Sequence, residues 1–426
     1  MKLMTARGVQ DSLPEEKIIK NQVVNTLKEV FELYGFAPLE TPIIERYETL
    51  AAKFAAGESS DIMKETFTLT DQGKRNLGLR FDLTVPLARF IAMNPTLKMP
   101  FKRFEMGVVF RDGPIKAGRV RQFWQCDVDT IGSKSMLADA EILAAIDTGF
   151  NKLKLDTVIK VNNRKLLNGI LEQAKIEDKE TAITSIDKLA KIGVKGVTDE
   201  LLQKGFQKKQ ITAIFKLIQE NISLAKLKKQ IKTEEGQEGI KELEELFTYL
   251  RNMGIKSVKF DVSLARGLAY YTGTIFEAFM KKGKITSSLA AGGRWDKMIG
   301  DFMGGNRIVP AVGGSFGIVP IIESIKEKEQ LTKKTLAQVL VIPINTQKES
   351  LQIVEQLRKE NINASLDLNG RGMSKNLQYA NALGIPYAII IGSDELKKNK
   401  VLLRDMVTGD QKLLALKSVV TKLKQQ

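Results

Sequence analysis

The C-terminal quarter of the chain has the pattern that most restricts its fold. From residue 336 onwards, short apolar runs of strand character alternate with amphipathic segments of helical character. This alternation predicts a parallel or mixed sheet covered by helices. A charged stretch before it is typical of a helix end followed by a linker, so residues 336–426 are predicted to form a separate small α/β domain. The expected strands are 336–344, 363–368 and 386–392, and the expected helices are 347–360 and 373–384.

The N-terminal part of the chain mixes helical and strand patterns. Apolar residues recur at helical spacing over 15–34, and Gly35 is expected to end that helix. Residues 77–83 are predicted to form a strand. Segments 107–111 and 123–131 are also predicted strands, and the loop between them contains glycine and proline. Strand, loop and strand together resemble an antiparallel hairpin.

The middle of the chain has a different texture. Between residues 176 and 250, Lys, Glu, Leu and Ile recur at helical spacing with few glycines, which predicts an inserted helical domain. Strand-like runs interleaved with glycine return at residue 258. The flanking strand-rich segments are therefore expected to belong to one domain that the helical segment interrupts.

Charge and cysteine content restrict the partners and the compartment. The chain has 66 Lys and Arg residues against 50 Asp and Glu, a formal net charge of +16. Such a surface suits a polyanion, because each neutralised phosphate releases counterions; a lysine-rich composition without such a partner explains the charge equally well. Cys126 is the single cysteine, which excludes an internal disulfide. The N-terminus has no apolar signal segment and no stretch is long enough to span a bilayer, so a cytoplasmic protein without a membrane partner is expected.

The sequence contains no histidine. This excludes mechanisms that need an imidazole base or a histidine metal ligand, among them Ser-His-Asp hydrolysis and most zinc enzymes. The chemistry must therefore depend on carboxylates, arginine, lysine, tyrosine, backbone N–H groups or a hard cation such as Mg²⁺.

Several blocks of sequence are specific enough to indicate a family. FRDGPIKAGRVRQFWQCDVDTIG, at 110–132, resembles motif 2 of the class II aminoacyl-tRNA synthetases in its histidyl form. LGLRFDLTVPLARF (77–90) and LARGLAYYTG (264–273) resemble two further elements of histidyl enzymes. NLQYANALGIPYAIIIG (376–392) resembles their anticodon-binding domain. These blocks follow one another in the family's order, which makes the resemblance stronger than any single match.

The resemblance implies an α+β fold. Its parts would be a class II catalytic domain with a six- or seven-stranded antiparallel sheet, a helical insertion and a C-terminal α/β anticodon-binding domain. The helix at 15–34 and the strand up to Pro42 would form the family's dimer interface, so a homodimer is expected. The implied domains are the first part of the catalytic domain with motifs 1 and 2 (1–175), the helical insertion (176–250), the second part of the catalytic domain with the arginine block and motif 3 (251–325), and the anticodon-binding domain (336–426).

The implied activity is activation of L-histidine with ATP and Mg²⁺, followed by transfer to a histidine tRNA. A carboxylate is already a nucleophile at neutral pH, so activation needs positioning and positive charge on the phosphate rather than a general base. Arginine suits this because it is always charged and presents a planar fork. The resemblance assigns Arg111 and Arg266 to the α-phosphate and the substrate carboxylate.

The resemblance also assigns the substrate pockets. Arg111, Arg119 and Phe123 would bind ATP, with the Phe123 ring stacked on adenine. Gln125, Asp127 and Asp129 alternate and therefore share one strand face, where two acidic groups suit a cationic substrate. The residues expected to bind histidine are Asp82, Thr84, Gln125, Asp129, Tyr270 and Tyr271.

The sequence departs from the family pattern at motif 3. A Glu-Arg pair usually follows the glycines there, and its arginine holds the ATP γ-phosphate; Val319 and Pro320 occupy those places here. Gly113 stands where many members have a motif 2 glutamate. Two alternatives to an active synthetase follow. One is a histidine-sensing regulatory paralogue, which typically lacks the anticodon-binding domain and the arginine block; the other is a tRNA-binding module that retains the scaffold alone.

Overall fold

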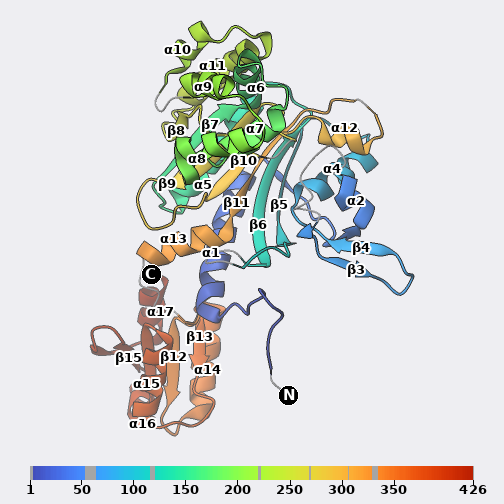
Figure 1. Cartoon of the computed structure of the whole chain (residues 1–426). Coiled ribbons are helices and arrows are strands. Elements are labelled where there is room, and N and C mark those ends of the chain that lie inside the picture. Colours follow the sequence, from blue (N-terminus) through green and yellow to red (C-terminus); the bar gives the residue numbers. More distant parts are fainter. Residues whose placement is uncertain are drawn as a thin grey trace. The chain divides into compact units, whose positions relative to one another are not determined.

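The computed structural model describes residues 3–52, 64–115, 120–218, 222–267, 270–305, 307–328 and 334–425. The chain divides into two compact units, Met1–Asp11 with Gln22–Lys328 and Ser12–Asn21 with Glu329–Gln426. Helix α1 (Pro14–Leu33) ends before Gly35, which adopts a left-handed φ of 72° as the sequence pattern predicted. Figure 1 shows the whole chain as a ribbon coloured from the N-terminus (blue) to the C-terminus (red).

The larger unit is built on a mostly antiparallel sheet in the order β1-β5-β6-β11-β10-β9-β7-β8. The six or seven strands that the resemblance implied are too few, because two short edge strands, β1 (Ala37–Pro38) and β8 (Val258–Phe260), bring the sheet to eight; both pair in parallel with their neighbours. The inner strands are β5 (Phe101–Phe110), β6 (Gln122–Ile131), β7 (Thr157–Asn163), β9 (Thr274–Met280), β10 (Ala290–Arg294) and β11 (Ala311–Gly317).

Strands β5 and β6 form the predicted antiparallel hairpin, paired along ten residues of each strand. One face of this part of the sheet is apolar and is covered by helices α1 and α5 (Met136–Lys152). There Phe316 of β11 lies 5.1 Å from Phe150 and 6.0 Å from Phe31, measured between ring centroids. The other face is therefore left for polar side chains.

The strand predicted at 77–83 is shorter than expected. Strand β4 (Asn76–Leu79) stops, and helix α4 (Thr84–Met93) begins, because the Asp82 carboxylate accepts hydrogen bonds from the amides of Thr84 and Val85. An acidic acceptor at this position stabilises a helix N-terminus. β4 belongs to a small antiparallel sheet with β2 (Ile44–Arg46) and β3 (Thr68–Thr70), beside helix α2 (Tyr47–Ala52).

The larger unit contains a run of amphipathic helices, of which the first, α6, lies before the predicted helical segment 176–250 (green in Figure 1). Gly169 and Gly236 allow two of them, α6 and α11, to pack closely, since a Cβ at Gly169 would lie 2.4 Å from the Gly236 Cα. The helices are α6 (Arg164–Gln173), α7 (Lys179–Ile186), α8 (Leu189–Gln203), α9 (Lys208–Leu217), α10 (Leu224–Gln230) and α11 (Glu234–Asn252). Two further helices, α12 (Met298–Phe302) and α13 (Ile318–Lys328), follow strands β10 and β11.

The C-terminal unit confirms the predicted strand and helix alternation. Its sheet has the order β13-β12-β14-β15-β16, with parallel pairing among the first three strands and antiparallel pairing after them. Gly384, with a φ of 67°, ends helix α15. The elements are β12 (Val339–Pro343), α14 (Gln347–Lys359), β13 (Ala364–Leu366), α15 (Met373–Leu383), β14 (Tyr387–Ile391), α16 (Ser393–Lys397), β15 (Val401–Asp405), β16 (Gln411–Leu414) and α17 (Leu416–Lys424).

Candidate active site

On the polar face of the sheet, the residues of three neighbouring strands, β5, β6 and β11, lie in rows across the strands; we call this set of rows the grid. The pairing register places residues of β5, β6 and β11 directly opposite one another. Side chains alternate between the two faces of a strand, so these rows all point away from the apolar core. The rows are Arg103, Asp129 and Gly313; Glu105, Asp127 and Ser315; and Gly107, Gln125 and Gly317.

Two glycines of the grid make room for charged groups. A Cβ at Gly313 would lie 1.9 Å from Oδ1 of Asp129, and a Cβ at Gly107 would lie 2.1 Å from Nη2 of Arg80. Neither position could hold a larger residue without moving the charged group. The glycines therefore determine where the Asp129 carboxylate and the Arg80 guanidinium lie.

The two aspartates of strand β6 are buried. Burial raises the pKa of Asp127 to about 8 and the pKa of Asp129 to about 6, although the nearby Arg103 acts in the opposite direction on both. Gln125 donates a 2.8 Å hydrogen bond to the Ser315 hydroxyl. Within the described part of the chain, Oδ1 of Asp127 and Oε1 of Gln125 are buried acceptors without a hydrogen-bond donor. We call this side of β6, with Gln125, Asp127 and Asp129, the acidic face. Its acidic groups and acceptor atoms suit a cationic ligand rich in donors.

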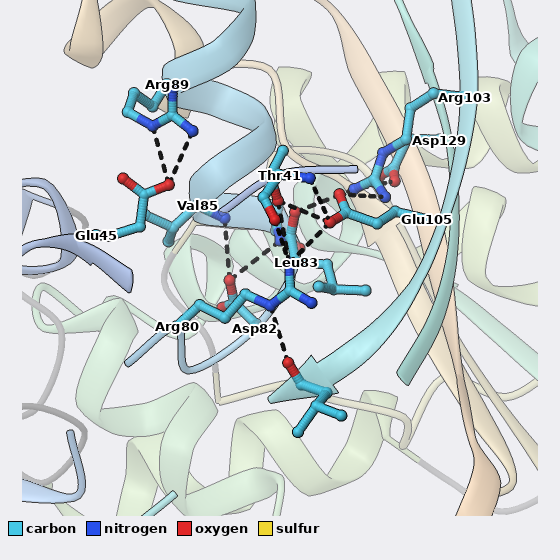
Figure 2. Close-up of polar contacts among 12 residues, drawn as sticks. Thr41, Glu45, Arg80, Asp82, Leu83, Val85, Arg89, Arg103, Glu105 and Asp129 are labelled. Atoms are coloured by element: carbon cyan, nitrogen blue, oxygen red, sulfur yellow. Dashed lines mark hydrogen bonds and ion pairs between the residues drawn. The ribbon is translucent and has the colours of Figure 1, made fainter. Parts of the chain in front are cut away.

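A buried ion-pair network lies beside the grid (Figure 2). Arg80 lies 2.9 Å from Glu105, which also accepts a 2.7 Å hydrogen bond from the Thr41 hydroxyl. Arg103 lies 2.9 Å from Asp129 and 3.6 Å from Glu105. The network ties strands β5 and β6 to the segment after β1 and to the segment that joins β4 to α4.

Asp82 and Thr84, both predicted to bind histidine, lie at the start of helix α4. The amides of Thr84 and Val85 hold the Asp82 carboxylate at 3.1 and 3.0 Å. The charge of Asp82 contributes to the raised pKa values of Asp127, Asp129 and Tyr270, although burial is the largest cause for all three groups. Asp82 is therefore close to the acidic face of β6.

Arg111 and Phe123, two of the residues predicted to bind ATP, lie at the end of the hairpin where the loop joins β5 to β6. The Arg111 guanidinium carbon lies 4.3 Å from the ring centroid of Phe81 and 5.1 Å from that of Phe123. Its Nε donates a 3.2 Å hydrogen bond to the Phe81 carbonyl oxygen. Arg111 and Phe123 are thus adjacent, as the family assignment expected. Arg119, the third predicted ATP ligand, lies outside the described residues.

The arginine block, LARGLAYYTG at 264–273, places Tyr270 near Asp82 and the acidic face. The rings of Tyr270 and Tyr271 lie 4.5 Å apart, and the Arg266 guanidinium carbon lies 6.0 Å from the Tyr271 centroid. Tyr271 is buried, while Tyr270 is partly buried against the cluster that includes Trp295. Burial raises the pKa of Tyr270 well above its usual value. Tyr270 is therefore a neutral hydroxyl group that can donate or accept a hydrogen bond.

Backbone contacts hold the arginine block in place. Nδ2 of the buried Asn162, on β7, donates hydrogen bonds of 2.9 Å to the carbonyl oxygens of Val262 and Leu264. Arg164 donates a 3.4 Å hydrogen bond to the Arg266 carbonyl oxygen. These side chains fix the path of the chain just before the arginine.

Arg294 is not part of the pocket. It forms a buried ion pair with Asp139, and its Nη1 donates a 2.9 Å hydrogen bond to the Ser133 carbonyl oxygen. Its role is to join strand β10 to the start of helix α5.

Among the residues that the structure describes, no group of three or more acidic, histidine or cysteine side chains could hold a metal ion. In the same residues, no helix is long and apolar enough to cross a membrane.

Comparisons with known proteins agree with this geometry. The Histidyl-tRNA synthetase family profile matches residues 8–321, and the Anticodon binding domain profile matches residues 338–426. The chain is 43% identical to "Histidine--tRNA ligase 1" of Bacillus cereus over 98% of its own length and 97% of that protein. The chain belongs to the histidyl-tRNA synthetase family.

Solved structures of related proteins share the fold. A histidyl-tRNA synthetase from Nostoc sp. PCC 7120 superposes with a TM-score of 0.88 at 32% identity, covering 100% of this chain and 99% of the other. A Bacillus halodurans protein described as an ATP phosphoribosyltransferase regulatory subunit/histidyl-tRNA synthetase gives a TM-score of 0.74 at 22% identity, covering 89% and 96%. The second likeness shows the fold alone.

The departures from the family pattern have local explanations. Pro320 lies in the first turn of α13, where the amide has no partner within the helix and proline is tolerated. The side chain of Pro320 lies 3.1 Å from where a Cβ of Gly317 would be. At Gly113, a Cβ would lie 2.8 Å from the Glu65 carboxyl group, so Glu65 fills the space that a motif 2 side chain would take.

Sequence reasoning missed the cations of the acidic face. Arg80 lay inside a quoted block without an assigned role, and Arg103 and Glu105 lay outside the strand predicted at 107–111. The alternation of Arg103 and Glu105 is the signal that could have found them, since it repeats the spacing of Asp127 and Asp129. Their partners depend on the pairing register, which that spacing alone does not give.

Proposed function

We propose that this chain activates L-histidine with ATP and transfers the histidyl group to the 3′ end of a histidine tRNA. The observation that supports this best is the buried acidic face of β6, with Arg111 in the loop that precedes this strand and Tyr270 of the arginine block near Asp82. Acidic acceptors suit the ammonium and imidazole groups of histidine. Arg111 and Arg266 suit the phosphate and the substrate carboxylate.

The chemistry follows from these positions. A carboxylate oxygen of histidine attacks the α-phosphorus of ATP; the bond from that phosphorus to the bridging oxygen breaks, and pyrophosphate leaves. Arg266 and Arg111 stabilise the charge that develops on the α-phosphoryl oxygens. Phe123 supports adenine by stacking. Asp82, Thr84, Gln125 and Asp129 hold the ammonium and imidazole groups, with Tyr270 and Tyr271 beside the ring.

In the second step a ribose hydroxyl of the terminal tRNA adenosine attacks the acyl carbon of the adenylate. The ester bond forms, the bond between the acyl carbon and the phosphate oxygen breaks, and AMP leaves. The hydroxyl proton passes to solvent. The tRNA substrate of this step is a polyanion, and a net charge of +16 favours its approach. The C-terminal unit binds the anticodon arm, and the helical segment at 176–250 contacts the acceptor stem. A homodimer formed through α1 and β1 completes the proposal.

Magnesium enters as part of the nucleotide substrate. Mg²⁺ usually keeps several waters and is bound by one or two carboxylates plus substrate phosphates rather than by a protein cage. This agrees with the absence of a clustered metal site among the described residues. Bound to ATP, the ion neutralises charge on the phosphates.

The regulatory alternative predicts histidine binding without chemistry. The match of residues 338–426 to an anticodon-binding domain favours a tRNA-charging enzyme instead. The deciding experiment is histidine-dependent exchange of pyrophosphate into ATP, followed by charging of a histidine tRNA. Exchange that requires histidine, and is not supported by other amino acids, is the expected result. Binding of histidine without exchange would overturn the proposal in favour of a sensor.

A further inference from the structure

Arg103 is the cation at the centre of the acidic face, and it is fully buried. Its Nη2 lies 2.9 Å from Oδ2 of Asp129, and its Nη1 lies 3.6 Å from Oε2 of Glu105. Nη2 also donates a 3.1 Å hydrogen bond to the carbonyl oxygen of Leu83, the residue that follows Asp82. One guanidinium group therefore contacts two strands and the segment that begins α4 (Figure 2).

This arrangement is a weak source of stability. Desolvation of a buried ion pair can exceed the attraction between the charges, so well-packed apolar residues often stabilise a fold equally well. Arg103 also keeps Nε and Nη1 buried without a hydrogen-bond acceptor among the described residues, which adds to its cost. A buried cation of this kind is better explained by what it does to its neighbours.

The neighbours differ in how completely they are satisfied. Glu105 is held by Arg80 at 2.9 Å and by the Thr41 amide at 2.9 Å. Asp129 is held by the ion pair between its Oδ2 and Nη2 of Arg103 and by the indole of Trp295, but no donor in the described part of the chain meets its Oδ2 in full hydrogen-bond geometry. Arg103 thus fixes the position of the Asp129 carboxylate.

We propose that Arg103 is a positioning residue for the amino-acid substrate: it holds the Asp129 carboxylate and the Leu83 carbonyl so that Asp129 and Asp82 present oxygens to the same cationic ligand. This inference rests on the proposed function, because the cationic ligand is histidine. Arg103 does not touch histidine itself. It acts through the carboxylate on β6 and through the segment before α4.

Charge supports the same role. The groups that act on Asp129 are Arg103 and Glu105 from β5, Asp82 before α4 and the indole of Trp295 after β10, while Asp127 adjoins it on β6. Arg103 is the charged group among them that lowers the pKa of Asp129, against burial and the carboxylates, which raise it. Without Arg103, the pKa of Asp129 would rise and more of the carboxyl group would be protonated at neutral pH.

The test uses the full chain with Arg103→Met and Arg103→Lys in histidine-dependent pyrophosphate exchange. Arg103→Met should raise the KM for histidine by about tenfold or more, while the KM for ATP changes by less than about twofold. The acidic limb of the kcat/KM profile for histidine should move to higher pH. Arg103→Lys should restore much of the pH profile through its charge, but less of the KM, because it lacks the planar fork.

The matched control is Arg89→Met. Arg89 is a partly buried arginine in an ion pair, 2.8 Å from Glu45, and its side-chain contacts within the described residues are with Glu45 and Met93 rather than with the acidic face. It should leave both KM values unchanged. If Arg103→Met does not fold, calorimetric affinity of Arg103→Lys for histidinol, which keeps the ammonium and imidazole groups, provides the test; a several-fold weaker affinity than wild type is expected.

Two results would overturn the inference. One is a folded Arg103 variant with an unchanged KM and pH profile for histidine; the other is a parallel rise of the KM for histidine and ATP, as a structural role predicts. Either result leaves the proposed function intact, provided that the wild-type chain exchanges pyrophosphate. Absence of exchange in the wild type would remove the proposed function and this inference together.

Discussion

The guanidinium group of Arg266 forms an ion pair with the carboxylate of Glu277 on strand β9. Both side chains are about one-fifth exposed, so the pair can be reached from solvent. Arg266 also faces the ring of Tyr271. The arginine is therefore already held in place by neighbours before a substrate carboxylate or phosphate arrives, as a preorganised donor must be.

Arg266→Ala should reduce adenylate formation on the order of 100-fold or more, because one preorganised charged donor is lost. It leaves Glu277 without its partner, so we expect a loss of unfolding free energy of about 1–3 kcal/mol as well. Arg266→Lys should recover only part of the rate. Pyrophosphate exchange and a thermal melt measure the two effects. Arg358→Ala, which breaks an exposed pair with Glu355, is the control; near-wild-type exchange in Arg266→Ala would remove Arg266 from the mechanism.

Asp127 makes the stability of the ligand-free protein depend on pH. Burial raises the pKa of Asp127 to about 8, with Arg103 opposing, whereas an aspartate in the unfolded chain has a value near 3.8. A raised folded-state pKa means that the folded state binds more protons between these values. Its contribution to stability is therefore complete below about pH 4 and is lost as the pH rises through about 8.

Asp127→Asn removes this titration. Between pH 5 and pH 9 the wild type should lose more unfolding free energy than the variant, by on the order of 1 kcal/mol or more. Denaturant unfolding at several pH values, without histidine or ATP, makes the comparison. Asp394→Asn, at an exposed position, should follow the wild type. An equal pH dependence in wild type and Asp127→Asn would show that the carboxyl group is not titrating in this range.

The fold was largely predictable because its periodic elements are long or strongly patterned. The C-terminal alternation and the helix at 15–34 were confirmed, with Gly35 and Gly384 ending their helices as expected. The segments of the edge strands β1 and β8 were predicted as extended, but their parallel pairing at the two edges of the sheet was not, because two or three residues do not establish a period. The strand predicted at 77–83 was cut short by Asp82, whose side chain caps a helix.

Sequence spacing predicted which residues of strand β6 share a face, but not the contacts that they make. Asp127 and Asp129 could be placed on one face from their spacing alone. What the spacing could not give is the register that sets Arg103 opposite Asp129, or the loop that brings Arg80 over Gly107. Those contacts join segments that are distant in the sequence, and they decide the charge of the acidic face.

Removal of the C-terminal unit should separate the two steps of the reaction. A chain that ends after Lys328 keeps helix α13 and every strand of the large sheet. We expect histidine-dependent pyrophosphate exchange to remain within about an order of magnitude, and tRNA charging to fall far more. The truncated protein must give a cooperative thermal melt for the comparison to count. Loss of exchange in a folded truncate would contradict the assignment of this unit to tRNA alone.

Binding of tRNA should weaken steeply with salt. Each phosphate neutralised by Lys or Arg releases counterions, so the logarithm of the affinity should fall linearly with the logarithm of salt concentration. For six to ten phosphate contacts, the loss between 50 and 200 mM salt would be roughly 10³-fold or more. Filter binding or fluorescence across a salt series measures the slope. Histidine affinity, measured in the same buffers, serves as the control and should change far less; a flat response for tRNA would count against nucleic-acid binding.

Gly313→Ala tests whether Asp129 contacts the substrate. The added Cβ would lie 1.9 Å from Oδ1 of Asp129, so the carboxylate must leave its present position, and strand β11 must also yield slightly because the Val128 carbonyl oxygen would lie 2.8 Å away. We expect a folded but less stable protein whose KM for histidine rises by at least about tenfold, with a much smaller change in the KM for ATP. Gly305→Ala is the control, since a Cβ there meets nothing within 4 Å. If Gly313→Ala folds and keeps the wild-type KM for histidine, Asp129 does not bind the amino acid, and the acidic face serves some other purpose.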